Sequence, residues 1–285
     1  MDSVMIVQRE NYERQKQRLL LGGFSQLQVI TDFDRTLTTN FHNGRKTASL
    51  ISALRESKIL SADYNLKAQA LYDYYHPLED DPSLDLVAKK SLMTEWWRRH
   101  FDLLIASGLK RSDIFQVVDK NLSCLRDGAD DFLQTLSRAM VPVTIFSASG
   151  LGISGLKYFF ERKGLLSDNL SFVANDFVWD EEGRAKEVLE PIIHTFNKSA
   201  TMFSSFGILD KVKNRNNVLL LGDSLGDVNM TAGLNHRAEL RIAFLNDRIL
   251  ESLPSYRDVY DALVLNDGNF DLPLGILREI EHYAD

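Results

Sequence analysis

The sequence predicts an α/β fold in which a doubly wound parallel sheet carries an inserted helical cap domain. Three observations lead to this prediction. Short apolar, β-branched runs alternate with helical stretches along most of the 285 residues. These runs are apolar on both faces, as expected for buried parallel strands. The alternation breaks once, where roughly 100 residues separate the first run from the second, far more than a crossover connection needs.

The expected strands are apolar runs that end in polar or glycine-containing turns. They cover residues 27–33, 141–149, 170–179, 216–224, 239–246 and 262–267. Helices are expected between most of them, at 127–140, 152–163 and 227–234, and the charged segment 1–23 is also helix-prone. A sheet built in this way binds ligands beyond the carboxyl ends of its strands.

Residues 41–125 form the long insertion and are expected to be helical, with no convincing strand. We therefore divide the chain into a core of residues 1–40 and 126–285 and a cap of residues 41–125. A helical domain placed above the strand ends can cover a site there and select its substrate.

The composition limits the class of protein and its partners. The net charge is −7, so no general basic surface indicates nucleic acid or an anionic membrane as a partner. The single cysteine, Cys124, excludes an intramolecular disulfide framework and a cysteine-rich zinc site. The N-terminus lacks the pattern of a secretory signal, and no run approaches the ~18 apolar residues that span a bilayer. We expect a cytoplasmic protein.

Pairs of aspartates follow two of the expected strands. Asp32 and Asp34 come at the end of the first run, and in an extended strand their side chains would share a face. Asp223 and Asp227 come just after the run that ends in "LLLG". Neighbouring carboxylates repel unless a cation lies between them, and Mg²⁺ prefers oxygen ligands. The four acids together predict a Mg²⁺ site at the ligand-binding edge of the sheet.

Two further residues could bind an anion at the same edge. "TIFSAS" places Ser147 at the end of another expected strand. Its hydroxyl and the backbone N–H groups that follow could hydrogen-bond a phosphate, as helix N-termini often do. Lys198 could supply positive charge to the same anion. Each residue by itself has a simpler explanation, as a helix N-cap and as a solvated surface lysine.

Two other functions compete with a phosphate site. "GLGISG", residues 150–155, matches the dinucleotide-binding fingerprint between a strand and a helix, with Asp176 further along. An oxidoreductase that uses a nicotinamide or flavin cofactor is therefore an alternative, although it leaves the four acids unexplained. A non-catalytic module that binds Mg²⁺ or a nucleotide would use the same acids. Phosphate release distinguishes an enzyme from such a module.

Several segments, in chain order, resemble a known family. "DFDRT" (32–36), Ser147, Lys198 and "GDSLGD" (222–227) resemble the four motifs of haloacid dehalogenase superfamily phosphatases. "YYHPLEDDP" (74–82), "MTEWWRRH" (93–100) and "FLNDR" (244–248) resemble the cytosolic 5′-nucleotidase III family, the pyrimidine 5′-nucleotidases. The resemblance implies a Mg²⁺-dependent enzyme that hydrolyses nucleoside 5′-monophosphates, and we expect it to be a monomer. CMP and UMP are the expected small-molecule substrates, and 7-methyl-GMP is a further candidate.

The resemblance also implies a role for each matched residue. Asp32 would attack the phosphate, and Asp34 would protonate the leaving nucleoside and then activate water. The cation would bind the Asp32 carboxylate, the Asp34 backbone carbonyl and Asp223, with Asp227 in support. The phosphate would be held by Ser147, the Ala148 backbone and Lys198.

Residues of the cap would recognise the base. Glu79 falls where the family has a glutamate that contacts the base. Trp97 is similar to the tryptophan of members that also take 7-methyl-GMP, whose cationic base a tryptophan face attracts. His100 replaces a small polar residue that contacts substrate in some members. Arg35 and "SASGLG" depart from the family pattern.

Overall fold

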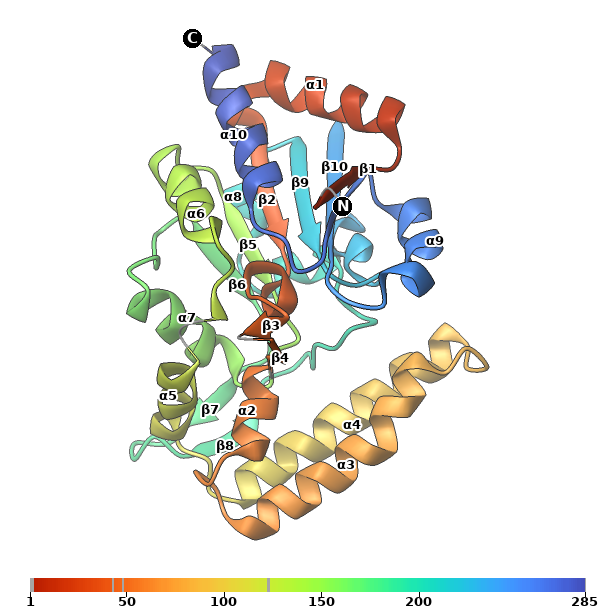
Figure 1. Ribbon diagram of the computed structural model, residues 1–285. Coiled ribbons are helices and arrows are strands. Elements are labelled where there is room, and N and C mark those ends of the chain that lie inside the picture. The colour runs from red at the N-terminus through yellow and green to blue at the C-terminus, as the bar shows by residue number, and fades with distance from the viewer. Residues whose placement is uncertain (1–2, 43, 48, 122–123, 285) are drawn as a thin grey trace.

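The computed structural model describes residues 3–42, 44–47, 49–121 and 124–284. These residues form a seven-stranded sheet with the order β1-β11-β10-β9-β2-β5-β6 (Figure 1). Its strands are β1 (Val4–Ile6), β2 (Leu27–Thr31), β5 (Val143–Phe146), β6 (Leu170–Val173), β9 (Asn217–Gly222), β10 (Ala238–Leu245) and β11 (Ala262–Leu265). Only β1, on the edge, runs antiparallel to its neighbour. Each expected run contains one parallel strand, so the predicted sheet is confirmed.

The middle of the sheet is buried on both faces. Every residue of β2, β5 and β9 is buried, which explains why their sequences are continuously apolar. In the register of these strands, Thr31 lies beside both Leu221 and Ile145. The carboxyl ends of three neighbouring strands therefore meet at one edge of the sheet.

Helices cover the sheet in the predicted places. The helices expected at 1–23, 127–140 and 152–163 are observed as α1 (Arg9–Gln26), α6 (Ala129–Arg138) and α7 (Gly152–Arg162). The C-terminal α10 (Asp271–Ala284) packs beside α1 (Figure 1). Residues 227–234 were expected to be an α-helix, but they form only a 3₁₀ turn, Asp227–Thr231, because Gly233 follows with φ +91°. Further helices in the described part of the core include η3 (Ala200–Ser204), α8 (Leu209–Val212) and α9 (Ile249–Val259).

The insertion is mainly helical. It contains α2 (Leu50–Glu56), α3 (Ala62–Asp80), α4 (Leu86–Ala106) and α5 (Arg111–Lys120). α3 and α4 form a long antiparallel hairpin that projects from the body of the protein (Figure 1). Ser61 and Asp85 begin these helices by accepting hydrogen bonds from backbone N–H groups one turn later. Among the helices of the described ranges, none is long and apolar enough to cross a membrane.

Some short strands were not predicted from the sequence. The insertion was expected to carry no strand, which was wrong, because it holds the hairpin of β3 (Phe41–His42) and β4 (Arg45–Lys46). These residues are exposed, so no apolar pattern marks them. The run at 170–179 divides into β6 and β7 (Phe177–Trp179), and β7 pairs with β8 (Ala185–Val188) in a second small sheet.

The cap is joined to the core at several points. The Thr39 N–H donates to the Cys124 carbonyl at 2.7 Å, so the two ends of the insertion lie side by side. At the far side, the Ala185 N–H of β8 donates to the carbonyl of Leu109, just before α5, at 2.8 Å. Phe101 of α4 is fully buried and belongs to the same apolar cluster as the central strands. These contacts hold the cap helices at the carboxyl-end side of the sheet.

Candidate active site

Three neighbouring strands end side by side at the edge of the sheet that faces the cap. Asp32 follows β2, Ser147 follows β5 and Asp223 follows β9. The strand ladder continues into this edge: the Asp32 N–H donates to the Leu221 carbonyl at 3.0 Å, and the Ser147 N–H donates to the Val173 carbonyl at 2.9 Å. The backbone positions of these polar residues are therefore set by the sheet itself.

The chain turns sharply after Asp32. Residues Phe33–Leu37 form a single wide turn in which Arg35 has φ 62°. Asp34 lies on this turn, so the expectation that Asp32 and Asp34 share a face of one extended strand is wrong. The Asp34 carboxylate accepts a hydrogen bond from the backbone N–H of Leu50, the first residue of α2. The turn therefore directs Asp34 toward the start of the cap.

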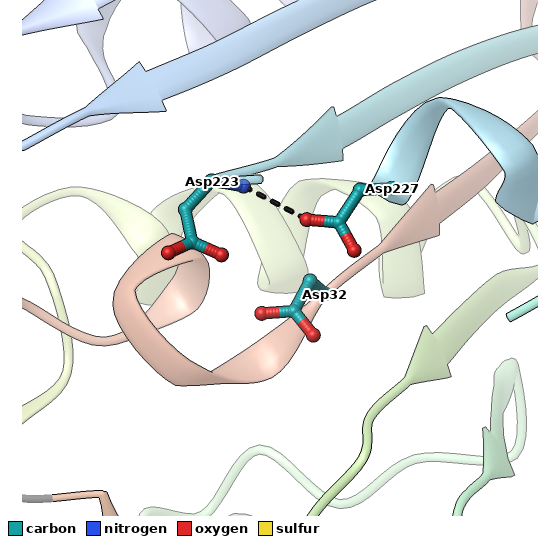
Figure 2. Close-up of side chains that lie close together, drawn as sticks. All are labelled: Asp32, Asp223 and Asp227. Atoms are coloured by element: carbon teal, nitrogen blue, oxygen red, sulfur yellow. Dashed lines mark hydrogen bonds between the residues drawn. The ribbon is translucent and has the colours of Figure 1, made fainter. Parts of the chain in front are cut away.

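Three carboxylates meet at this edge (Figure 2). One oxygen from each of Asp32, Asp223 and Asp227 lies within 4.8 Å of the others. The Lys198 ammonium donates to Asp32 and, at 2.9 Å, to Asp227 Oδ1. When all three carboxylates are ionised, one lysine leaves an excess of two negative charges, which a single divalent cation would neutralise. Hard oxygen donors with this excess charge fit Mg²⁺.

Asp227 and Asp223 have different surroundings. Asp227 is fully buried, and its Oδ2 accepts the Asp223 N–H at 3.1 Å, the Ser224 N–H at 3.0 Å and the Ser224 hydroxyl at 2.9 Å. A Cβ atom on Gly222 would lie 2.5 Å from the Asp227 Cβ, so only glycine fits there. Burial first, and then the charge of Asp227, raise the pKa of Asp223 to about 7. Asp227 thus shapes the loop that carries Asp223.

The protonation of this cluster is strongly perturbed. Burial raises the pKa of Asp32, and Asp227 adds to this effect, although Lys198 opposes it. Burial also raises the pKa of Asp34. The pKa of Lys198 lies above its ordinary value because the attraction of Asp227 and Asp32 outweighs burial, so its ammonium stays charged. An added cation would therefore stabilise the ionised form of these carboxyl groups.

The loop after β5 lies against the cap. Ser147 is buried, and its Oγ accepts the Ser149 N–H at 3.1 Å, which holds Ala148 between them in a tight turn. A Cβ atom on Gly150 would lie 2.7 Å from the Trp97 ring of α4. The structure therefore brings Ser147 and Ala148 to the same edge as Asp32, with Trp97 packed on the loop that follows them.

The glycines of the "GLGISG" segment are explained by packing. Gly150 makes room for Trp97, and a Cβ atom on Gly155 would lie 3.0 Å from Ile114 of the cap. Gly152 has φ +75°, a conformation that favours glycine. The Asp176 carboxylate lies against this same helix start, because a Cβ atom on Gly152 would be 3.1 Å from Asp176 Oδ1. The oxidoreductase alternative therefore has no support from this segment.

Glu79 and Trp97 of the cap lie next to loops of the core. Glu79 Oε1 accepts the Thr195 hydroxyl at 2.7 Å, three residues before Lys198. Trp97 is part of a series of stacked rings that includes Trp96 on one side, with ring centroids 6.2 Å apart. Both residues therefore lie where the cap meets the core.

His100 occupies a different position, inside the cap. Its side chain is only 4% exposed, and a ring nitrogen is 3.1 Å from the Tyr64 hydroxyl. Burial lowers the pKa of His100 to about 4, so the ring is neutral near neutral pH. Its ring stacks behind Trp97, with centroids 5.9 Å apart. The contacts of His100 are therefore with Tyr64 and Trp97 of the cap.

The segment from Glu190 to Lys198 is a part of the site that sequence reasoning missed. It meets the cap helix α4 through the Arg98–Glu190 ion pair at 2.6 Å and the contact of the Thr94 hydroxyl with His194 Nε2 at 3.1 Å. The polar residues of "HTFNKSA" were the available signal, but only Lys198 was assigned a role. The same segment therefore contacts the cap and supplies the lysine.

Comparisons with known proteins agree with this geometry. The family model described as pyrimidine 5′-nucleotidase (UMPH-1) matches residues 35–281. A Gallus gallus protein named 7-methylguanosine phosphate-specific 5′-nucleotidase is 36% identical over 259 residues, which cover 90% of this chain and 89% of the relative. The Homo sapiens protein of the same name is 34% identical, with 91% of this chain and 86% of the relative covered.

Of two similar solved structures, one agrees with this family and the other shows the fold. The crystal structure of cytosolic 5′-nucleotidase IIIB bound to cytidine matches with a TM-score of 0.91 at 27% identity, covering 100% of this chain and 95% of that chain. A probable phosphoserine phosphatase from Vibrio cholerae, with a TM-score of 0.59 at 15% identity, covers 92% of this chain and 67% of that chain and shows the shared fold alone. The resemblance seen in the sequence is confirmed: the chain belongs to the pyrimidine 5′-nucleotidase (UMPH-1) family and is a hydrolytic enzyme.

Proposed function

We propose that the protein hydrolyses nucleoside 5′-monophosphates to a nucleoside and phosphate, through an aspartyl-phosphate intermediate on Asp32 and with Mg²⁺ as cofactor. The observation that carries this proposal is the cluster of Asp32, Asp223 and Asp227 around Lys198, at strand ends beneath a cap. A phosphate bound there would meet a nucleophile, a cation site and a fixed ammonium within one small volume.

In the first step, an Asp32 carboxylate oxygen forms a bond to phosphorus while the bond from phosphorus to the nucleoside oxygen breaks. Asp34 gives its proton to that leaving oxygen, and the raised pKa of Asp34 favours the protonated form that this task requires. In the second step, Asp34 takes a proton from water as the water attacks phosphorus and the Asp32–phosphorus bond breaks. Lys198, hydrogen-bonded to Asp32, offsets the charge of the phosphate oxygens.

The cation would be held by the carboxylates of Asp32 and Asp223 and by the Asp34 carbonyl. Asp227 would act in support, because its oxygens already accept hydrogen bonds from the loop and from Lys198. When bound, Mg²⁺ supplies positive charge to the phosphate oxygens. Ser147 and the Ala148 backbone would bind the opposite side of the phosphate.

The cap would select the base. Glu79 and Trp97 lie next to the core loops, so we assign them contacts with the base, and we assign the buried His100 the indirect task of supporting Trp97. The family description favours pyrimidine nucleotides, whereas the names of the chicken and human relatives favour 7-methylguanosine phosphate. A tryptophan face would attract the cationic 7-methylguanine ring. CMP, UMP and 7-methyl-GMP are therefore the substrates to compare.

The same proposal includes the organisation of the chain. We propose a core of residues 1–40 and 126–285 with a cap of residues 41–125, because the chain leaves and re-enters the core side by side at Thr39 and Cys124. We also propose that the protein is a monomer and that it is cytosolic, the location being in line with a Caenorhabditis elegans relative named putative cytosolic 5′-nucleotidase 3. Light scattering of the purified protein tests the monomer.

Phosphate release from a nucleotide panel tests the proposed function. The panel contains CMP, UMP, 7-methyl-GMP and an aryl phosphate, each with Mg²⁺ and with EDTA, and the Asp32→Asn variant is the control. We expect phosphate from at least one nucleotide, only with Mg²⁺ and only from the wild type. A protein that binds CMP with Mg²⁺ but releases no phosphate would be a binding module, and the proposal would then be wrong.

A further inference from the structure

Arg126 is a buried cation just outside the cluster that binds phosphate in the proposed function. Its side chain is 1% exposed, and it lies in the segment that returns from the cap to the core. Its Nε donates to the Thr36 carbonyl at 2.9 Å, and its Nη2 donates to the Arg35 carbonyl at 2.7 Å and the Thr38 carbonyl at 3.0 Å. One guanidinium thus binds two carbonyls of the turn that carries Asp34 and the carbonyl of Thr38, directly after that turn.

These carbonyls need a partner from elsewhere in the chain. The turn at Phe33–Leu37 is not a regular helix, since Asp34 and Arg35 have non-helical φ and ψ angles, so its carbonyls cannot all be satisfied within the turn. A buried carbonyl without a donor costs about 1–3 kcal/mol. The fixed fork of an arginine side chain can satisfy several such groups at once.

Asn246 completes the same arrangement. Its Nδ2 donates to the Arg35 carbonyl at 3.0 Å, and its Oδ1 accepts from Arg126 Nη2 at 3.1 Å. Asp267 pairs with Arg126 Nη1 at 3.0 Å and also accepts the Asn40 N–H at 2.8 Å. Asn246 belongs to the "FLNDR" segment, to which the proposed mechanism assigns no role. Residues far apart in the sequence therefore converge on the single turn after Asp32.

We infer that Arg126 and Asn246 are positioning residues that hold the turn after Asp32 so that the Asp34 carboxyl stays in reach of the leaving oxygen. Neither residue contacts the reacting atoms. Both act on the backbone of Arg35, the residue directly after Asp34, and so fix where the Asp34 side chain begins. The inference rests on the proposed function, because it assigns these residues to the acid and base of that mechanism.

The test compares two leaving groups in the first turnover of enzyme in excess over substrate. Cytidine is a poor leaving group and needs a proton from Asp34, whereas p-nitrophenol leaves without one. We expect Asn246→Ala to slow the release of cytidine from CMP by about 10- to 100-fold, because small misplacements of a catalytic group have effects of this size. Release of p-nitrophenol should change by less than about 3-fold.

Three further variants make the result specific. Asp34→Asn should show the same preference for the better leaving group, and adding Asn246→Ala to it should cause little further loss, because both changes act through one carboxyl group. Asn269→Ala changes an exposed asparagine at the same end of the core and should behave like the wild type. Arg126→Lys should resemble Asn246→Ala if it folds, since lysine keeps the charge but loses the fork.

The outcomes separate this inference from the proposed function. Equal losses on CMP and p-nitrophenyl phosphate, or no loss on either, would show that Asn246 has only a structural role or none, and would overturn the inference while the function stands. Additive losses in the double variant would also overturn it. A wild-type protein that releases neither product would overturn the proposed function and this inference with it.

Discussion

The acidic cluster at the sheet edge and the interior of the cap both bury ionisable groups, but the two regions differ in charge. In the cluster, burial raises the pKa of Asp32 and Asp223, so their negative charges are costly without a cation. In the cap and its contact segment, burial lowers the pKa of His100 and His194 to about 4, so both rings are neutral near pH 7. The buried acids of the first region are the groups that a bound cation would keep ionised, whereas the buried histidines of the second region are uncharged near pH 7.

This difference in charge indicates separate roles for the acidic cluster and the cap. A charged cluster with one ammonium is suited to binding a cation and a phosphate, which every nucleotide carries. The cap instead carries two half-buried tryptophans, each backed by a buried ring: Tyr75 stacks on Trp96 at an interplanar angle of 10°, and Phe101 stacks on Trp97 at 28°. A packed aromatic face can discriminate between bases by shape and by cation–π attraction. Changes in the cluster should therefore affect all substrates, and changes in the cap should affect some more than others.

The largest effect is expected from Asp32→Asn. The change is nearly isosteric but removes the nucleophile, so kcat should fall by at least about 10⁴-fold on every substrate. Phosphate release measures the loss, and circular dichroism should show an unchanged fold. Residual activity close to that of the wild type would refute the assignment of Asp32 and make the cluster a binding site only.

Lys198→Met should have the next largest effect. It leaves Asp32 and Asp227 buried without their ammonium, so we expect a loss of about 3–5 kcal/mol in the free energy of unfolding. The same change should lower kcat/KM by about 10²–10³-fold, with little difference between substrates. Denaturant unfolding and phosphate release measure the two effects. Lys213→Met, which breaks an exposed ion pair with Asp210, is the matched control and should change neither.

Glu79→Gln should change selectivity rather than chemistry. Glutamine can still accept the Thr195 hydroxyl but carries no negative charge, so only the charge near the base is lost. We expect kcat/KM for 7-methyl-GMP, whose base is cationic, to fall about 10-fold relative to UMP, with the aryl phosphate unchanged. Competition between paired substrates measures this ratio. An equal fall on all of them would argue that Glu79 has no part in base recognition.

The smallest effect is a pH dependence of opposite sign in the two regions, measured as Tm in EDTA. In the folded protein the pKa of Asp223 is about 7, against an ordinary value of 3.8. The contribution of Asp223 to stability is therefore fully present below pH 3.8 and is lost as pH rises through about 7. In the folded protein the pKa of His100 is about 4, against an ordinary value of 6.5. The contribution of His100 to stability is therefore fully present above pH 6.5 and is lost as pH falls through about 4.

Variants separate these opposing contributions. Compared with the wild type, Asp223→Asn should make the slope of Tm against pH between 4 and 7 more positive, and His100→Gln, which can still bond the Tyr64 hydroxyl, should make it more negative. Shifts of a few degrees are expected. Adding Mg²⁺ should raise the Tm of the wild type more at pH 8 than at pH 5, since the cation requires ionised carboxylates. Parallel profiles for the two variants would contradict the comparison.

The main sheet and part of the site were predictable because a strand that is buried along its whole length has a recognisable apolar sequence. Strands buried on both faces read as continuous apolar runs, and the residues after them, such as Asp32, Ser147 and Asp223, were placed together by the rule that parallel strands end at one edge. Strands such as β1 and β3 were missed because they are short and have no buried face of their own. They exist only through their pairing partners.

By itself, then, the sequence determined the fold class, the identity of the acids and the edge of the sheet where they lie. Tertiary structure decided how each polar group is used. It placed Asp34 on a turn rather than on the strand, and it gave Asp227 Oδ2 hydrogen bonds from the backbone of its own loop. It also buried His100 against Trp97 and brought Arg126 to the turn after Asp32. The physical reason is that a hydrogen-bond partner distant in the chain leaves no periodic pattern near the residue that it binds.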